Sequence, residues 1–148
     1  MKQTLYIIRG LPGSGKSALA SLIAERTGAY THEAEQFFVV SNGHTEKYKF
    51  DRRLLGAAHD ECYGRVMRRL WQGKDAVVAN TFSTQREVNR YLNGLDRCGL
   101  GKKVEVKIIK CVGALVVAGR TRVPSKAIEK MRDRWEDVEN ETTFNGEL

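Results

Sequence analysis

The sequence contains few cysteines and no long apolar run, and these absences exclude several classes of protein. Its three cysteines are far apart and without C-x-x-C spacing, which argues against a disulfide framework or a zinc site and favours reduced thiols. No run of about 18 apolar residues is present, so no membrane span is predicted. The N-terminal segment lacks a small-residue cleavage site, which argues against a signal peptide. We therefore expect a cytoplasmic protein.

Positive charge is missing from the last fourteen residues, which hold five acidic side chains and no Lys or Arg. In residues 1–134, by contrast, 25 Lys and Arg stand against 13 Asp and Glu, a formal charge of +12. Such a basic body favours a polyanionic partner such as nucleic acid, although a solvated, Lys/Arg-rich surface explains the charge equally well. We expect residues 136–148 to form an acidic tail. The oligomeric state is left open.

Apolar runs and helical periodicity alternate along the chain. Short apolar runs predict strands at Thr4–Arg9, Tyr30–Glu33, Ala76–Ala79 and Val104–Val112. Helices are predicted at Lys16–Thr27, Arg52–Trp71, Thr84–Cys98 and from Pro124, where Ile128, Met131, Trp135 and Val138 would be buried. Residues 39–49 are expected to be irregular, with a turn at Asn42-Gly43. The alternation predicts one α/β domain over residues 1–148, with a mostly parallel sheet of four or five strands and ligands at the carboxyl ends of those strands.

The segment from Gly10 to Ser17 matches the pattern G-x-x-x-x-G-K-[ST], between a predicted strand and a predicted helix. Its glycines let backbone N–H groups curl around a phosphate, and the next helix presents its positive N-terminus. Lys16 is expected to reach the β- and γ-phosphates, and the Ser17 hydroxyl to bind Mg²⁺. The predicted binding residues for a nucleoside triphosphate, Mg-ATP by preference, are Gly10, Leu11, Pro12, Gly13, Ser14, Gly15, Lys16, Ser17 and Ala18.

Further motifs are spread over nearly the whole chain. They are Glu33-Ala34-Glu35-Gln36-Phe37-Phe38, Tyr48-Lys49-Phe50-Asp51 with Ala58-His59, Val78-Ala79-Asn80-Thr81-Phe82, and Val123-Pro124 with Met131-Arg132-Asp133-Arg134-Trp135-Glu136. With the glycine loop, they resemble the small P-loop kinase-like proteins of phages and their eukaryotic relatives, and more distantly the kinase domain of phage polynucleotide kinase. The resemblance implies a P-loop NTPase of the nucleotide-kinase-like type, a three-layer sandwich. It also implies ATP-dependent phosphoryl transfer, in the host cytoplasm if the protein is phage-encoded.

The resemblance also implies a general base. In polynucleotide kinase an aspartate corresponds to Glu35 and takes the proton of the 5′-hydroxyl that attacks the γ-phosphate. Glu35 is one methylene longer, which leaves two interpretations, an active base in a shifted frame or a degenerate site. We favour the active base. Glu33 is the nearest substitute, but on a strand it would face the other way.

Two other segments would complete such a site. Asn80 and Thr81 stand at the expected tip of the third strand, where more distant relatives hold the acceptor with an aspartate in place of Asn80. Residues 113–123 correspond to an arginine-bearing lid. Either Arg120 or Arg122 would there neutralise charge on the transferring phosphoryl group, although solvated loop arginines would give the same pattern. No Walker-B aspartate is apparent, so Mg²⁺ would rest on Ser17, the phosphates and water.

Residues 47–53 interleave basic and aromatic side chains, a pattern that can hold a nucleic-acid strand by phosphate contacts and base stacking. Tyr48 is therefore a candidate substrate contact, although Tyr48 and Phe50 could equally pack beneath the loop. Phe38, at the end of the motif of residues 33–38, is a further candidate substrate contact. The leading functional hypothesis is a kinase for a hydroxyl, by preference the 5′-hydroxyl of a nucleic acid. The alternatives are a nucleoside, nucleotide or modified-base kinase, and an ATP-binding interaction protein with little turnover.

Overall fold

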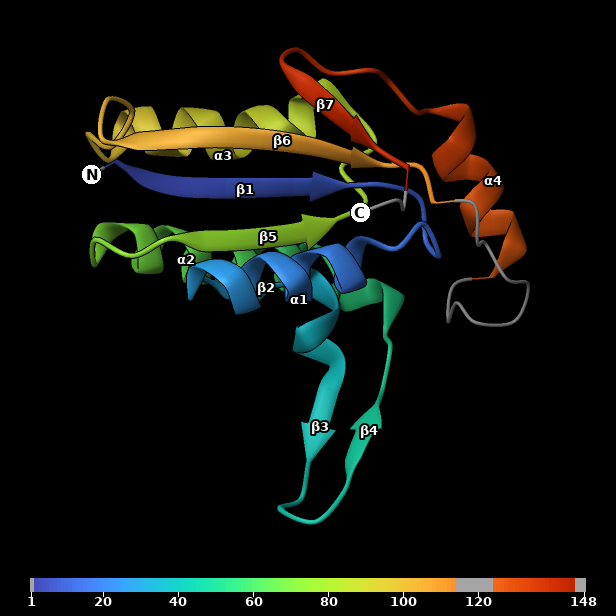
Figure 1. Cartoon of the computed structure of the whole chain (residues 1–148). Coiled ribbons are helices and arrows are strands. Elements are labelled where there is room, and N and C mark those ends of the chain that lie inside the picture. The colour runs from blue at the N-terminus through green and yellow to red at the C-terminus, as the bar shows by residue number, and fades with distance from the viewer. Residues whose placement is uncertain (1, 114–123, 146–148) are drawn as a thin grey trace.

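Five parallel strands form the central sheet, in the order β2-β5-β1-β6-β7 (Figure 1). The computed structural model describes residues 2–113 and 124–145. The strands are β1 (Gln3–Arg9), β2 (Tyr30–His32), β5 (Ala76–Asn80), β6 (Val104–Cys111) and β7 (Glu141–Phe144). β1 lies in the middle, with Ile7 in register with Val78 of β5 and Ile108 of β6. The predicted α/β fold with a parallel sheet is confirmed.

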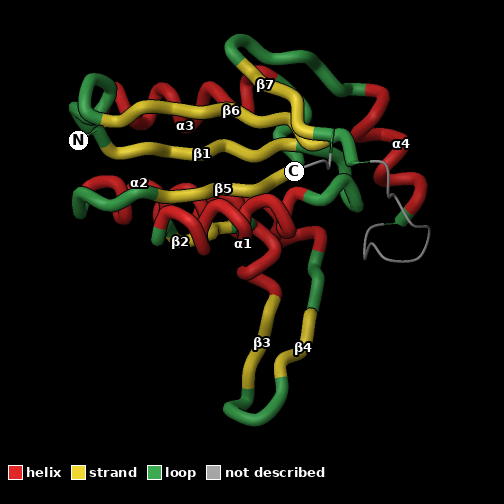
Figure 2. The backbone as a smooth tube through the Cα atoms, in the orientation of Figure 1, coloured by secondary structure: helices red, strands yellow, loops and turns green. Residues whose placement is uncertain are grey.

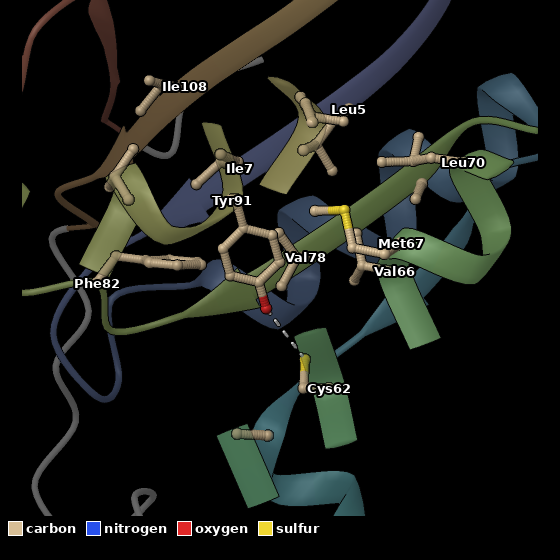
Figure 3. Close-up of a cluster of buried hydrophobic side chains, with 14 of the residues drawn as sticks. Leu5, Ile7, Cys62, Val66, Met67, Leu70, Val78, Phe82, Tyr91 and Ile108 are labelled. Atoms are coloured by element: carbon tan, nitrogen blue, oxygen red, sulfur yellow. Dashed lines mark hydrogen bonds between the residues drawn. The ribbon is translucent and has the colours of Figure 1, made fainter. Parts of the chain in front are cut away.

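Helices pack on both faces of this sheet and make it the middle of three layers (Figure 2). These helices are α1 (Lys16–Thr27) on one face and α2 (Leu55–Trp71) and α3 (Gln85–Arg97) on the other, while α4 (Ser125–Asp133) lies beyond the carboxyl ends of the strands (Figure 1). Alternate side chains of β1 serve the two cores: Leu5 and Ile7 pack with α2 and α3, and Ile8 packs with α1. Figure 3 shows the larger core. Among the described residues, no helix is long and apolar enough to cross a membrane.

A short arm leaves the body of the protein between β2 and α2 (Figure 1). It starts with the 3₁₀ helix η1 (Ala34–Phe38), continues into an antiparallel hairpin of β3 (Val39–Ser41) and β4 (Glu46–Tyr48), and returns through the 3₁₀ helix η2 (Arg52–Leu54). The prediction of an irregular segment was wrong here. At the hairpin turn, Oδ1 of Asn42 accepts hydrogen bonds from the N–H groups of His44 and Thr45.

The C-terminal part of the chain also differs from expectation. α4 ends at Asp133 and buries no residue fully, so the predicted longer amphipathic helix was wrong. Val138 is buried after the end of that helix. The prediction of a tail over residues 136–148 is corrected as well, because Glu141–Phe144 pairs in parallel with Ile108–Cys111 and forms the edge strand β7. A polar edge strand of this kind has little apolar signal in the sequence.

A fully buried arginine explains why an acidic segment returns to the sheet. Arg9, at the end of β1, has no exposed surface. Its guanidinium donates to Oε2 of Glu141 over 2.6 Å and to the carbonyl oxygens of Phe82 and Glu136, and it lies 4.0 Å from the centre of the Trp135 ring. A buried cation has to be paired, so the acidic segment carries the counter-ion of the central strand.

Candidate functional site

The loop between β1 and α1 lies at the carboxyl end of the sheet, where the sequence placed it. Gly13 and Gly15 have φ angles of 84° and 95°, a left-handed conformation that favours glycine. Gly10 is packed so closely that a Cβ there would meet Oγ of Ser14 and lie 3.0 Å from the carbonyl oxygen of Cys111. Three of the loop glycines are therefore required by its shape.

Backbone hydrogen bonds hold this loop between neighbouring segments. The N–H of Gly10 donates to the carbonyl of Thr81 over 3.2 Å, and the N–H of Gly113 donates to the carbonyl of Ser14 over 3.2 Å. α1 begins directly after the loop at Lys16, and Gly15 offers no side-chain cap. The free N–H groups of the first helical turn thus face the loop, which is the arrangement that binds an anionic phosphate.

Lys16 is half-buried at the start of α1, and its Nζ donates to the carbonyl of Leu11 over 3.1 Å. Burial lowers the pKa of Lys16 from its ordinary value, while the negative charge of Glu35, then of Cys111 and Glu33, acts in the opposite direction. Because Coulomb interactions weaken with distance, Glu35 and Glu33 are the carboxylates that act most on the ammonium group of the phosphate loop.

Ser17 is in direct contact with Glu33: the hydroxyl Oγ donates to Oε1 over 2.7 Å. The expectation that Glu33 faces away from the site was wrong. β2 ends at His32 and η1 begins at Ala34, so strand alternation does not extend to Glu33 and Glu35. An acidic residue directly after the second strand was the available signal for this contact.

Glu35 lies in the first turn of η1 and is exposed. Asn80, at the end of β5, holds this turn, because its Oδ1 accepts a hydrogen bond from the N–H of Ala34 over 2.8 Å. Nδ2 of Asn80 lies 3.7 Å from Sγ of Cys62, and the Asn80 side chain is 7% exposed. The structure thus gives Asn80 a positioning role beneath the segment that carries Glu35. Thr81 is partly exposed next to it.

The aromatic candidates belong to one cluster at the base of the arm. Phe38 is 3% exposed, and its ring centre lies 6.2 Å from that of Tyr48 and 5.1 Å from that of Phe50. Phe50 is 52% exposed. Substrate contact by Phe38 and Tyr48 stays a prediction, while the Phe38 ring has a packing role. Arg120 and Arg122 fall outside the described residues.

Together, the parallel sheet, the glycine loop after β1 and the uncapped helix behind that loop define a P-loop NTPase. Residues 5–138 match the model of the AAA_33 family, which is described as an AAA domain. Since the match extends over most of the chain, the protein belongs to this family. Nucleotide binding is the property that the class implies.

Solved structures with the same fold include kinases. A sugar kinase from Janibacter is 15% identical, with a TM-score of 0.66, over 98% of this chain and 86% of the kinase. Kti12 from Chaetomium thermophilum, in complex with ADP-AlF3, is 14% identical, with a TM-score of 0.68, over 97% and 89%. A chain of the Pnkp1/Rnl/Hen1 RNA repair complex is 17% identical, with a TM-score of 0.65, over 90% and 44%. At such identities the likeness is one of fold.

Proposed function

We propose that this protein is an ATP-dependent phosphotransferase that acts on a hydroxyl group. The observation that carries the proposal is the position of Glu35, an exposed carboxylate in the first turn of η1, directly after β2, whose charge partly offsets the lowering of the Lys16 pKa by burial. A carboxylate next to the phosphate loop can accept the proton of an attacking hydroxyl. A protein that only binds nucleotide has no need of a base on the acceptor side.

The reaction follows from these positions. The loop amides and Lys16 hold the β- and γ-phosphates, and the acceptor hydroxyl approaches from the side of η1. Its oxygen forms a bond to the γ-phosphorus as the proton passes to Glu35. The bond from that phosphorus to the β–γ bridging oxygen breaks, and ADP leaves with the electron pair. Asn80 takes part through Ala34, because it holds the turn on which Glu35 stands.

The residues beside the loop fit a magnesium ion. Mg²⁺ prefers oxygen ligands and keeps several waters, and the Ser17 hydroxyl and Glu33 carboxylate are two oxygen donors already 2.7 Å apart. When bound, the ion would neutralise charge on the β- and γ-phosphates. We assign Ser17 as the ligand and Glu33 as the carboxylate that orients Ser17 or its bound waters.

A nucleic-acid 5′-hydroxyl is the acceptor that we favour. Residues 1–134 carry a formal charge of +12, and the exposed Lys47, Lys49 and Phe50 lie on the arm that continues from η1. A chain of the same fold belongs to an RNA repair complex, which supports this choice. Arg120 or Arg122 would neutralise the transferring phosphoryl group from the segment before α4.

The test is transfer of γ-labelled phosphate from Mg-ATP to a panel of 5′-hydroxyl DNA, 5′-hydroxyl RNA and free nucleosides. Wild type should label the oligonucleotides, Glu35→Gln should bind ATP normally but transfer at least about a hundredfold more slowly, and Lys16→Ala should lose both functions. ATP binding with no labelled acceptor would overturn the kinase and favour an ATP-binding interaction protein. Labelling of nucleosides alone would replace the acceptor by a nucleoside, nucleotide or modified base.

A further inference from the structure

A second basic site lies at the edge of the sheet, away from the phosphate loop. It is a cavity of about 350 Å³ between the edge strand β2 and the C-terminal half of α2. Its lining consists of His32, Arg65, Arg68, Arg69 and Gln72. Every lining residue is basic or a hydrogen-bond donor, which suits an anion.

Two of the three arginines have no carboxylate partner. Arg65 is 3.3 Å from Oε1 of Glu61 and also donates to the backbone carbonyl of Glu33. Among the described residues, neither Arg68 nor Arg69 forms an ion pair. Arg69 lies over an aromatic ring instead, with its guanidinium carbon 3.6 Å from the centre of the Tyr30 ring. A contact with the face of a ring uses none of the guanidinium N–H groups, so they are available to a planar or tetrahedral oxyanion.

His32 supplies an independent observation. Its side chain is 7% exposed, yet within the described ranges neither Nδ1 nor Nε2 has a hydrogen-bond partner. Burial, and then the charges of Arg65 and Arg69, lower the pKa of His32 to about 4. Buried polar groups are nearly always paired, so a neutral imidazole with an unused N–H donor that lines a cationic cavity points to a missing acceptor.

The cavity is joined to the proposed reaction site through the backbone. His32 immediately precedes Glu33, which contacts Ser17, and it lies three residues before Glu35. Three residues span at most about 11 Å, so the His32 end of the cavity is near the acceptor side, while Arg68 and Arg69 extend the cavity toward the amino ends of the strands, where the carbonyl of Leu70 accepts from Gln3. Arg65, which lines the cavity, donates to the carbonyl of Glu33. One residue of the cavity therefore contacts the backbone of the proposed reaction site.

We propose that this cavity binds a backbone phosphate of the nucleic-acid strand whose 5′-hydroxyl is the acceptor, with Arg68, Arg69 and His32 as donors. The inference rests on the proposed function and specifies its substrate as a strand. A phosphodiester has two free oxygens that can accept from an arginine fork and from an imidazole N–H together. A free nucleoside has no phosphate to place there.

Binding of a fluorescent single-stranded 12-mer with a 5′-hydroxyl, measured by anisotropy without ATP at several salt concentrations, tests the site on the whole chain. Arg68→Gln/Arg69→Gln should weaken binding at least about tenfold and reduce the salt slope by about one. The control Lys102→Gln/Lys103→Gln removes equal charge from exposed positions directly before β6, outside the lining of the cavity, and should change affinity less than about threefold. Equal losses in the two variants would overturn the site.

His32→Phe keeps a buried ring and removes both nitrogens, so it should weaken strand binding while the protein stays folded. In wild type, the ring resonances of His32 should shift with the strand at concentrations where inorganic phosphate leaves them unchanged. Saturation by inorganic phosphate or by an acidic peptide at strand concentrations would overturn the nucleic-acid assignment. Because the binding assay contains no ATP, its result does not depend on whether phosphoryl transfer occurs. If the arginine variant labels strands as well as wild type does, the assignment of the cavity is overturned and the proposed kinase activity is not.

Discussion

Arg9 and Glu141 form an ion pair across 132 positions of sequence, with Nη1 of the arginine 2.6 Å from Oε2 of the glutamate. The arginine side chain is fully buried, and the glutamate side chain is 12% exposed. Removal of one partner from such a pair leaves the other charge buried and uncompensated. The pair therefore ties the strand that precedes the phosphate loop to the last strand of the sheet.

Glu141→Ala should lower the free energy of unfolding by about 3 kcal/mol, because Arg9 loses the one charged partner that it has among the described residues and keeps two carbonyl acceptors. Urea denaturation measures the loss. Glu139→Ala, at an exposed position of the same segment, is the matched control and should stay within about 0.5 kcal/mol of wild type. Equal stability of the two variants would mean that the ion pair contributes nothing.

Glu33→Gln should raise the Mg²⁺ concentration required for half-maximal ATP binding roughly tenfold, the usual effect of removing a partner behind a metal ligand. The amide can still accept the Ser17 hydroxyl, so the change isolates the charge. Titration calorimetry of ATP at several Mg²⁺ concentrations gives the number. Glu25→Gln, exposed on α1, controls for net charge, and an unchanged Mg²⁺ requirement in Glu33→Gln would remove Glu33 from the metal site.

Asn80→Ala should cost about 2 kcal/mol of stability, because the buried N–H of Ala34 loses its acceptor. The turn that carries Glu35 should move, so phosphoryl transfer should fall more than ATP affinity does. Denaturation and transfer assays on one preparation separate the effects. Asn93→Ala, exposed on α3, should change neither. A variant that loses ATP affinity and transfer in equal measure would contradict the positioning role.

Stability should fall as the pH is lowered from about 6.5 to about 4, because the unfolded chain takes up the His32 proton before the folded protein does. The stability that comes from neutral His32 is fully present above the pKa of the unfolded chain, is lost as the pH falls toward the pKa of the folded protein, and changes no further below that value. Urea denaturation at pH 7 and pH 4.5 should show a smaller loss in His32→Phe, by up to about 2 kcal/mol. The control His44→Phe, at an exposed position on the arm, should lose as much stability between the two pH values as wild type does. An equal loss in His32→Phe would mean that burial does not disfavour the charged imidazole.

The parts of the fold that carry local signals could be predicted from the sequence. Glycine spacing located the phosphate loop, and apolar runs located four of the five strands of the central sheet. β7 could not be predicted in this way, since only Glu141 and Phe144 are even partly buried in it and its pairing is with a distant strand. The hairpin had its turn signal at Asn42-Gly43, but Val39 and Val40 are exposed and lack strand alternation.

The site was predictable to a similar extent. Lys16, Ser17 and Glu35 follow from the motif and the resemblance, and their roles stay predictions; Glu35 is exposed in the first turn of η1, and its charge acts on Lys16. The Glu33 contact was missed because the alternation of a strand was extended one residue beyond its end. The inward position of Asn80 depends on Ala34 and Cys62, and no sequence rule brings those residues together. The basic cavity forms only because β2 and α2 are adjacent in the folded chain, and the sequence alone does not reveal that tertiary contact.

The strand order also bears on how the protein can be made. β1 is synthesised first, but its neighbours β5 and β6 begin only at residues 76 and 104, and the counter-ion of Arg9 follows at residue 141. Pairings this distant form slowly. While the ribosome completes the chain, the apolar side chains Leu5, Ile7 and Ile8 have no sheet to join and are exposed to aggregation. Chaperones that bind extended apolar segments are therefore expected to engage the β1 segment while the later strands are being synthesised.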